Sequence, residues 1–212
     1  MTTDARTRIT RPGAKRYGLS VSDPKRFIYV RTAKVATRSI SAAFNNRPDL
    51  EVVMHRGRLR RWPQGEQRDY PAFGFVRNPF TKLVSCWQDK VVGTGRGTWR
   101  LTSVQDRSFE EFVTALEGMD ILVGDRHVRP QVAALPLDRL SFVGRFERLV
   151  PDWERVCEWL DLGEIPLPRE NVSATPAEPV RVEPALAARI VRLYELDFQM
   201  FGYSTEIPEK LR

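Results

Sequence analysis

The sequence is poor in cysteine, with two in 212 residues, and neither belongs to a C-x-x-C pair. Two cysteines cannot build a disulfide framework and are too few to hold a structural zinc ion, so no metal is expected. No apolar run approaches the roughly 20 residues that a transmembrane helix needs. The first 16 residues carry five basic side chains but lack the apolar core of a signal peptide. These absences predict a soluble, cytoplasmic protein without a membrane span.

Acidic residues are outnumbered, because 27 Asp and Glu stand against 34 Lys and Arg and leave a net charge of +7. This charge favours anionic partners, which include phosphate or sulfate groups, acidic glycans, nucleic acid and anionic lipid. Hydrophobic residues make up 42% of the chain, which suffices for one buried core, and the length fits one domain. We expect a basic flexible tail over residues 1–24 and a single domain over residues 25–212.

Short apolar runs alternate with stretches of helical spacing along the chain. Runs at residues 26–31, 51–54, 72–76 and 140–144 predict strands, and helical patterns stand between them. Asn78 before Pro79 is a helix start, Ser108 with Glu111 predicts a capping box, and residues 186–201 predict one long final helix. The alternation predicts an α/β fold: a P-loop-like single domain with a central, mainly parallel sheet flanked by helices.

Ligands of such sheets bind at the carboxyl ends of the strands. The first loop to inspect, residues 31–40, places Lys34 before the hydroxyl residues Thr37 and Ser39 at a helix N-terminus. Free N–H groups, the helix dipole and the ammonium favour a bound phosphate. The loop contains no glycine and no G-x-x-x-x-G-K-[ST] motif, which argues against an ATPase or GTPase. An ordinary strand-to-helix turn with a solvated lysine is an equal alternative for this loop taken alone.

The second loop follows the run at residues 72–76. Arg77 at its end and Ser85 two helical turns later offer a planar guanidinium and a hydroxyl for a second phosphate. An arginine here also suits a simple surface ion pair. Two such loops at equivalent positions of strand-helix units arise by chance less often than one alone.

At these loops the chain resembles the sulfotransferases that use 3′-phosphoadenosine-5′-phosphosulfate (PAPS), in the branch of carbohydrate and heparan sulfate enzymes. Residues 75–85 match the family's 3′-phosphate motif F-V-R-[DN]-P-x-x-[RK]-L-V-S nearly throughout. Residues 31–40 are similar to its 5′-phosphosulfate loop, P-K-x-x-x-T-S, although Ala33 replaces the proline and Arg38 a small residue. Residues 143–147 and 194–203 also resemble this branch.

The resemblance implies PAPS as sulfuryl donor and a metal-independent in-line transfer to a hydroxyl, or less readily an amine. It implies that Lys34 stabilises the bridging oxygen as the bond to sulfur breaks. For the general base it leaves two histidines, His55 first and His127 second, with Glu51 as a weaker candidate. Donor binding is assigned to the two loops, at Lys34, Val35, Ala36, Thr37, Arg38, Ser39, Arg77 and Ser85.

The acceptor is a carbohydrate, a lipid or another small molecule by this resemblance, and nucleic acid is not expected. The basic segment 56–61, with Arg96, Arg100, Arg126 and Arg129, suits an acidic acceptor, although a solvated face is the more common role of such charges. Residues 93–107 predict a long loop, a candidate acceptor lid. Two other hypotheses stay open: a non-catalytic polyanion or nucleic-acid binding protein, and a nucleotide kinase with an atypical P-loop.

Overall fold

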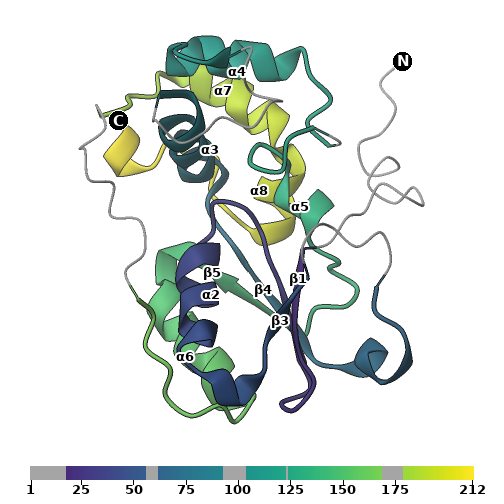
Figure 1. Cartoon of the computed structure of the whole chain (residues 1–212). Helices are drawn as coiled ribbons and strands as arrows, with labels where there is room; N and C mark the ends of the chain where they lie inside the picture. The colour runs from purple at the N-terminus through teal and green to yellow at the C-terminus, as the bar shows by residue number, and fades with distance from the viewer. Residues whose placement is uncertain (1–17, 56–61, 93–103, 123, 169–178) are drawn as a thin grey trace. The chain divides into compact units, whose positions relative to one another are not determined.

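The computed structural model describes residues 18–55, 62–92, 104–122, 124–168 and 179–212 (Figure 1). These residues form a five-stranded sheet in the order β3-β1-β2-β4-β5. The β2–β4 and β4–β5 pairs are parallel, whereas β1 is antiparallel to both β2 and β3. The α/β fold is confirmed, and the sheet is mixed. Its strands are β1 (Leu19–Ser22), β2 (Phe27–Val30), β3 (Val53–Met54), β4 (Ala72–Val76) and β5 (Phe142–Arg145).

Strand β1 lies inside the stretch that the sequence assigned to a flexible tail. Its four residues are all buried, and they pair with β2 through a tight turn in which the Arg26 amide donates to the Asp23 carbonyl. Two of the four are serines, so the apolar pattern is too short to predict a strand. The ordered fold therefore begins before residue 25, and residues 1–17 lie outside the described part of the chain.

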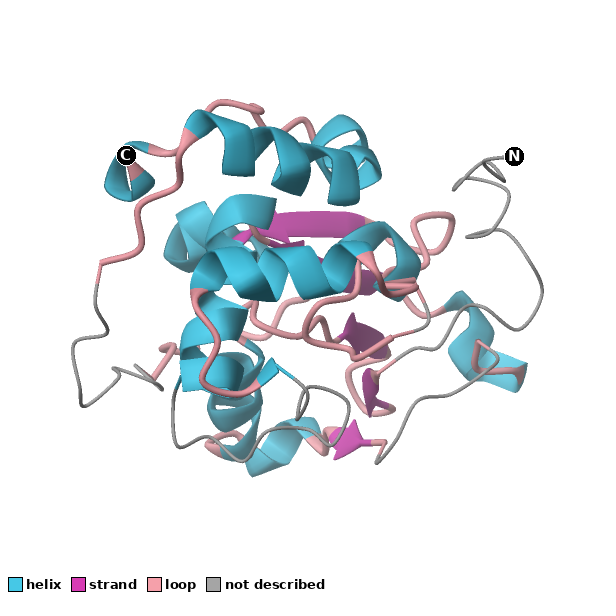
Figure 2. Cartoon of the chain, turned by 90° about the horizontal axis from the view of Figure 1, so that it is seen from above, coloured by secondary structure: helices cyan, strands magenta, loops and turns pink. Residues whose placement is uncertain are grey.

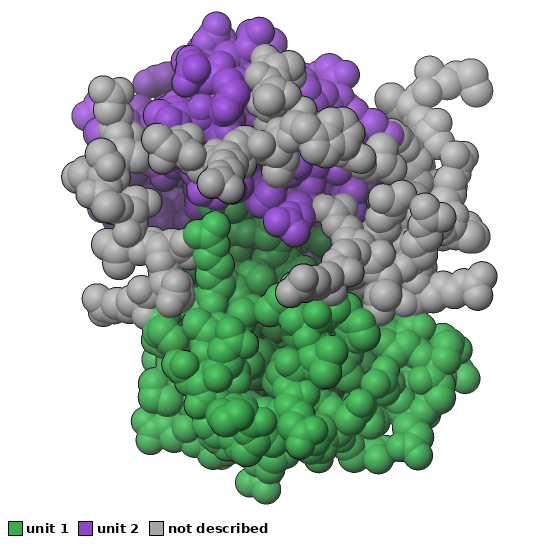
Figure 3. Space-filling model, in the orientation of Figure 1, with its two compact units in different colours: residues 1–76, 131–172 green, residues 77–130, 173–212 purple. Residues whose placement is uncertain are grey.

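The chain divides into two compact units, coloured separately in Figure 3. Unit 1 comprises residues 1–76 and 131–172, and unit 2 comprises residues 77–130 and 173–212. The sheet belongs to unit 1. Among the described residues, no helix of either unit is both long and apolar enough to cross a bilayer.

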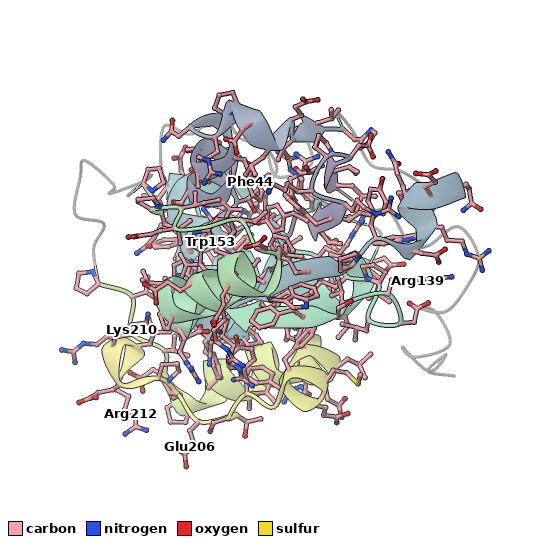
Figure 4. All side chains as sticks on the ribbon, turned by 90° about the horizontal axis from the view of Figure 1, so that it is seen from below. Phe44, Arg139, Trp153, Glu206, Lys210 and Arg212 are labelled. Atoms are coloured by element: carbon pink, nitrogen blue, oxygen red, sulfur yellow. The ribbon has the colours of Figure 1, made fainter. Side chains whose placement is uncertain are left out.

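The core of unit 1 packs helices α2 (Thr37–Asn45) and α6 (Leu149–Trp159) on one face of the sheet. Alternate residues of β2 and β4 point to this face, because side chains of a strand alternate with a period of two. The rings of Phe44 on α2 and Trp153 on α6 meet edge to face at 5.5 Å between centroids (Figure 4). This packing fixes α2 and with it the loop that enters the helix from β2.

Strand β5 approaches β4 so closely that it needs a glycine. A Cβ on Gly144 would lie 2.3 Å from the ring of Phe75, which no side chain can tolerate without displacing that ring. The short helix α5 (Gln131–Ala134) and the segment after it complete the unit.

Unit 2 is helical (Figure 2). Helix α3 (Pro79–Trp87) continues into a π-helical turn, η3 (Gln88–Val92), and a buried apolar cluster joins it to α4 (Phe109–Glu117) and α7 (Pro184–Leu193). Both predicted helix starts are confirmed: the Asn78 side chain accepts from the amides of Phe80 and Thr81, and Ser108 and Glu111 form a capping box.

The prediction of one long final helix is wrong. The helix breaks at Tyr194, whose backbone angles (φ −117°, ψ 23°) are not helical, and α8 (Glu195–Phe201) follows. The apolar stripe continues across the break, so spacing alone could not reveal it. The Tyr194 ring is buried, and its hydroxyl donates to the Val128 carbonyl at 2.6 Å. A tertiary contact thus coincides with the break.

Candidate active site

Four strands of unit 1 end at the same edge of the sheet. Strand β3 runs in the direction of β2, because both are antiparallel to β1, and β4 and β5 are parallel to β2. The loop after β2, His55 after β3 and the Val76–Arg77 peptide after β4 therefore all begin at this edge. It is the edge at which open α/β sheets bind their ligands.

The loop between β2 and α2 has the features of an anion site. Lys34 and Ala36 both adopt left-handed backbone angles, with φ of 66° and 48°, a conformation that non-glycine residues adopt at some cost in energy and that clusters at ligand sites. Helix α2 begins directly after Ala36 with no side-chain cap and no acidic residue in its first turn. Its first amides and the positive end of its dipole thus face the loop.

The same loop has a buried hydroxyl group near its start. The Thr32 side chain is only 3% exposed, and its hydroxyl oxygen has no hydrogen-bond partner among the described residues. Its backbone carbonyl accepts from the Thr37 hydroxyl at 2.6 Å, which ties the start of the loop to the start of the helix. Buried hydroxyls are normally satisfied, and those of Ser20 and Tyr29 on the adjacent strands likewise have no partner among the described residues.

The remaining predicted loop residues take different places. Val35 is fully buried in the core of unit 1, so only its backbone is available to a ligand. Ser39 is buried, whereas Lys34 and Thr37 are half-buried. Arg38 is exposed.

His55 is connected to this loop through Arg31, which sequence analysis treated only as the loop's first residue. One guanidinium nitrogen of Arg31 donates to the His55 carbonyl at 2.6 Å and to the Leu19 carbonyl at 3.1 Å. The His55 amide donates to the same Leu19 carbonyl. A histidine and the lysine loop are thereby fixed at one edge of unit 1. Glu51 precedes β3 and is exposed at its opposite end, so the structure does not bring it to this edge.

In unit 2, Arg77 and Ser85 belong to one row of polar side chains. The Arg77 Nε donates to the Thr81 hydroxyl at 3.1 Å, and Thr81 in turn donates to the Asn78 carbonyl at 3.3 Å. Thr81 and Ser85 are four residues apart on α3 and so share a helix face. Thr81 is a candidate site residue that sequence reasoning missed, because its place in the motif carries no residue preference.

His127, the second candidate base, is buried and paired with Asp125. Its Nδ1 lies 2.7 Å from the Asp125 Oδ1, which also accepts from the His127 amide at 2.8 Å. A carboxylate only accepts hydrogen bonds, so Nδ1 carries the proton and Nε2 is left as the basic nitrogen. Burial lowers the pKa of His127, an effect that Asp125 opposes and that the nearby Arg126 and Lys90 reinforce.

Several predicted acceptor contacts lie outside the described residues, namely segment 56–61 and the part of the long loop that contains Arg96 and Arg100. Arg126 is exposed, as a solvated charge would be. Arg129 differs: its side chain is 4% exposed and donates to the Gly124 carbonyl at 3.1 Å, so it has a role inside the unit. Within the described ranges, no cluster of three or more His, Cys, Asp or Glu side chains has the arrangement of a metal site.

Comparison with known proteins agrees with this geometry. The model of the sulfotransferase family matches residues 17–204. Carbohydrate sulfotransferase 14 of Mus musculus is 28% identical over 225 aligned residues, which cover 86% of this chain and 59% of the relative. This chain thus spans less than two thirds of that relative's length. No solved structure matches the chain.

Proposed function

The chain belongs to the sulfotransferase family, and from this premise we propose that it transfers the sulfuryl group of PAPS to a hydroxyl group of a carbohydrate. The observation that carries the proposal is a pair of strand-to-helix junctions with the features of anion sites. They follow β2 and β4, two neighbouring parallel strands. A nucleotide with phosphates at both its 3′ and 5′ positions is a ligand that two such junctions suit.

The residues present fit the donor. The uncapped start of α2, the buried Thr32 hydroxyl, and the hydroxyls of Thr37 and Ser39 would hold the 5′-phosphosulfate. Arg77 and Ser85, with Thr81 orienting the guanidinium, would hold the 3′-phosphate. This second contact would distinguish PAPS from ATP, which carries no 3′-phosphate.

Sulfuryl transfer is an in-line displacement in which the protein positions the partners and neutralises charge. The acceptor oxygen bonds to sulfur, the bond from sulfur to the bridging oxygen breaks, and adenosine 3′,5′-bisphosphate (PAP) departs. The role of the Lys34 ammonium would be to stabilise the negative charge that develops on the departing oxygen. The acceptor proton passes to a general base on the enzyme.

His55 is our first choice for that base, because it lies at the same edge of unit 1 as the loop of Lys34. His127 is the second, because its pairing with Asp125 leaves Nε2 unprotonated. A carbohydrate acceptor is supported by the similarity to an enzyme named as a carbohydrate sulfotransferase and by the net charge of +7, which favours acidic glycans.

The test is transfer of radiolabelled sulfate from PAPS to a panel of glycans, lipids and phenols, together with PAP binding by calorimetry. Arg77→Ala is expected to weaken PAP binding at least tenfold, since it removes a charged contact, and Lys34→Ala chiefly to lower turnover. Lys210→Ala and Arg212→Ala, exposed charges labelled in Figure 4, are matched controls without an expected effect. Unchanged kinetics in both test variants would refute the mechanism. Binding to random DNA without affinity for PAP would favour the polyanion-binding alternative.

A further inference from the structure

Two buried side chains of unit 2 hold three successive carbonyl groups. The Lys82 Nζ donates to the His127 carbonyl at 3.3 Å and to the Arg129 carbonyl at 2.9 Å. The Tyr194 hydroxyl donates to the carbonyl between them, that of Val128, at 2.6 Å. We call Lys82 and Tyr194 the carbonyl clamp.

The two residues of the clamp are buried and contact each other. Both side chains are 1% exposed, and the ammonium lies 5.6 Å from the centroid of the Tyr194 ring, within the range of a cation–π contact. Burial raises the pKa of Tyr194 well above 10, which keeps its hydroxyl protonated as a donor. A buried ammonium is retained only where several partners replace its water, and here the carbonyls and the ring do so.

The clamped backbone is the second half of a turn built on Asp125. The Asp125 carbonyl accepts from the amides of Val128 and Arg129, and its carboxylate accepts from the amide and Nδ1 of His127. The turn is thus held by Asp125 from one side and by the clamp from the other. His127, at its centre, has both its backbone and its imidazole fixed.

Lys82 stands in the motif that supplies Arg77 and Ser85, and the sequence alone assigns it no role of its own. In the structure Thr81 accepts from Arg77, whereas the next residue, Lys82, donates to the 127–129 backbone. Helix α3 thus connects the predicted 3′-phosphate ligands to the segment of His127.

We propose that Lys82 and Tyr194 are positioning residues, which hold the His127–Arg129 backbone on α3 and keep the His127 imidazole in one orientation, and that Lys82 is not a donor ligand. The inference rests on the proposed function only for its consequence in catalysis. If α3 binds the donor, the clamp fixes His127 relative to that donor.

Two measurements test the clamp separately from the function. The chain has only two histidines, so ring ¹⁵N NMR spectra contain two imidazoles, which His55→Gln assigns. In the wild type we expect His127 to be the Nδ1–H tautomer above its pKa. In Lys82→Met we expect a mixture of tautomers, because the ring loses its fixed orientation relative to Asp125. We also expect a pKa closer to 6.5, because a released ring is less buried and burial is the main cause of its lowered pKa. PAP affinity should stay within threefold, and a tenfold fall of kcat in this variant would identify His127 rather than His55 as the general base.

Three further variants complete the experiment. Lys82→Arg retains the donors and should restore most of the wild-type ring spectrum. Lys210→Met makes the same chemical change at an exposed lysine of unit 2 and should change nothing. Tyr194→Phe removes one hydroxyl and should perturb the His127 signals in the same direction, which decides the matter if Lys82→Met does not fold.

The proposal is overturned if Lys82→Met weakens PAP binding tenfold or more while the His127 signals stay unchanged, since Lys82 would then be a donor ligand. The proposal is also overturned if Lys82→Met changes neither the PAP affinity nor the His127 ring signals. If the wild type does not bind PAP at all, the proposed function fails, but the ring spectra still show whether the clamp holds His127.

Discussion

Thr81 offers a sharp test of the proposed 3′-phosphate site. Its side chain is 5% exposed, and its hydroxyl accepts a hydrogen bond from the Arg77 Nε at 3.1 Å. Thr81→Val keeps the shape of the side chain and removes only the hydroxyl. A hydrogen bond to a charged group contributes about 1.5–3 kcal/mol. Because Arg77 is half-buried and water can replace part of the contact, we expect a loss of PAP binding free energy just below that range.

A loss of about 1.4 kcal/mol corresponds to a tenfold increase of the PAP Kd, measured by calorimetry. Thr114→Val is the matched control: its hydroxyl also accepts from an arginine, Arg189, at 2.6 Å, but on the exposed surface of α4. PAP affinity should be unaffected there. If both variants bind PAP as the wild type does, Thr81 does not orient Arg77 for a phosphate. The row formed by Arg77, Thr81 and Ser85 then does not act as one phosphate site.

Three further outcomes concern stability. Burial lowers the pKa of His127 in the folded state, so the unfolded chain binds more protons below pH 6.5. The free energy of unfolding should therefore fall as the pH decreases from 6.5 through the folded pKa. His127→Gln should remove this part of the pH dependence, whereas His55→Gln should not. Asn78→Ala should lower the free energy of unfolding by about 1 kcal/mol in urea titrations, because it removes the cap of α3; an unchanged midpoint would contradict that role. Gly144→Ala should cost about 1–3 kcal/mol, since its Cβ meets the Phe75 ring, and a variant as stable as the wild type would show that β5 can move away.

The sequence by itself predicted the parts whose physics is local. The strand-to-helix junctions at Lys34 and Arg77, the Asn78 cap and the capping box of Ser108 all depend on residues within a few positions of one another. Apolar runs likewise identified the parallel strands β2 and β4, which are buried on both faces, and β5, in which Val143 is exposed. The residues of the two predicted donor loops follow from the same local patterns and from the family resemblance.

Only the tertiary structure decided what depends on partners far away in the chain. Strand β1 exists because β2 and β3 pair with it, and the final helix breaks where Tyr194 reaches Val128, 66 residues earlier. Lys82 carries the same charge whether it binds a phosphate or the carbonyls of residues 127 and 129, and its burial alone separates the two roles. Periodicity and motifs record which side chains are present, but the direction in which a buried donor points depends on the packing of the whole unit.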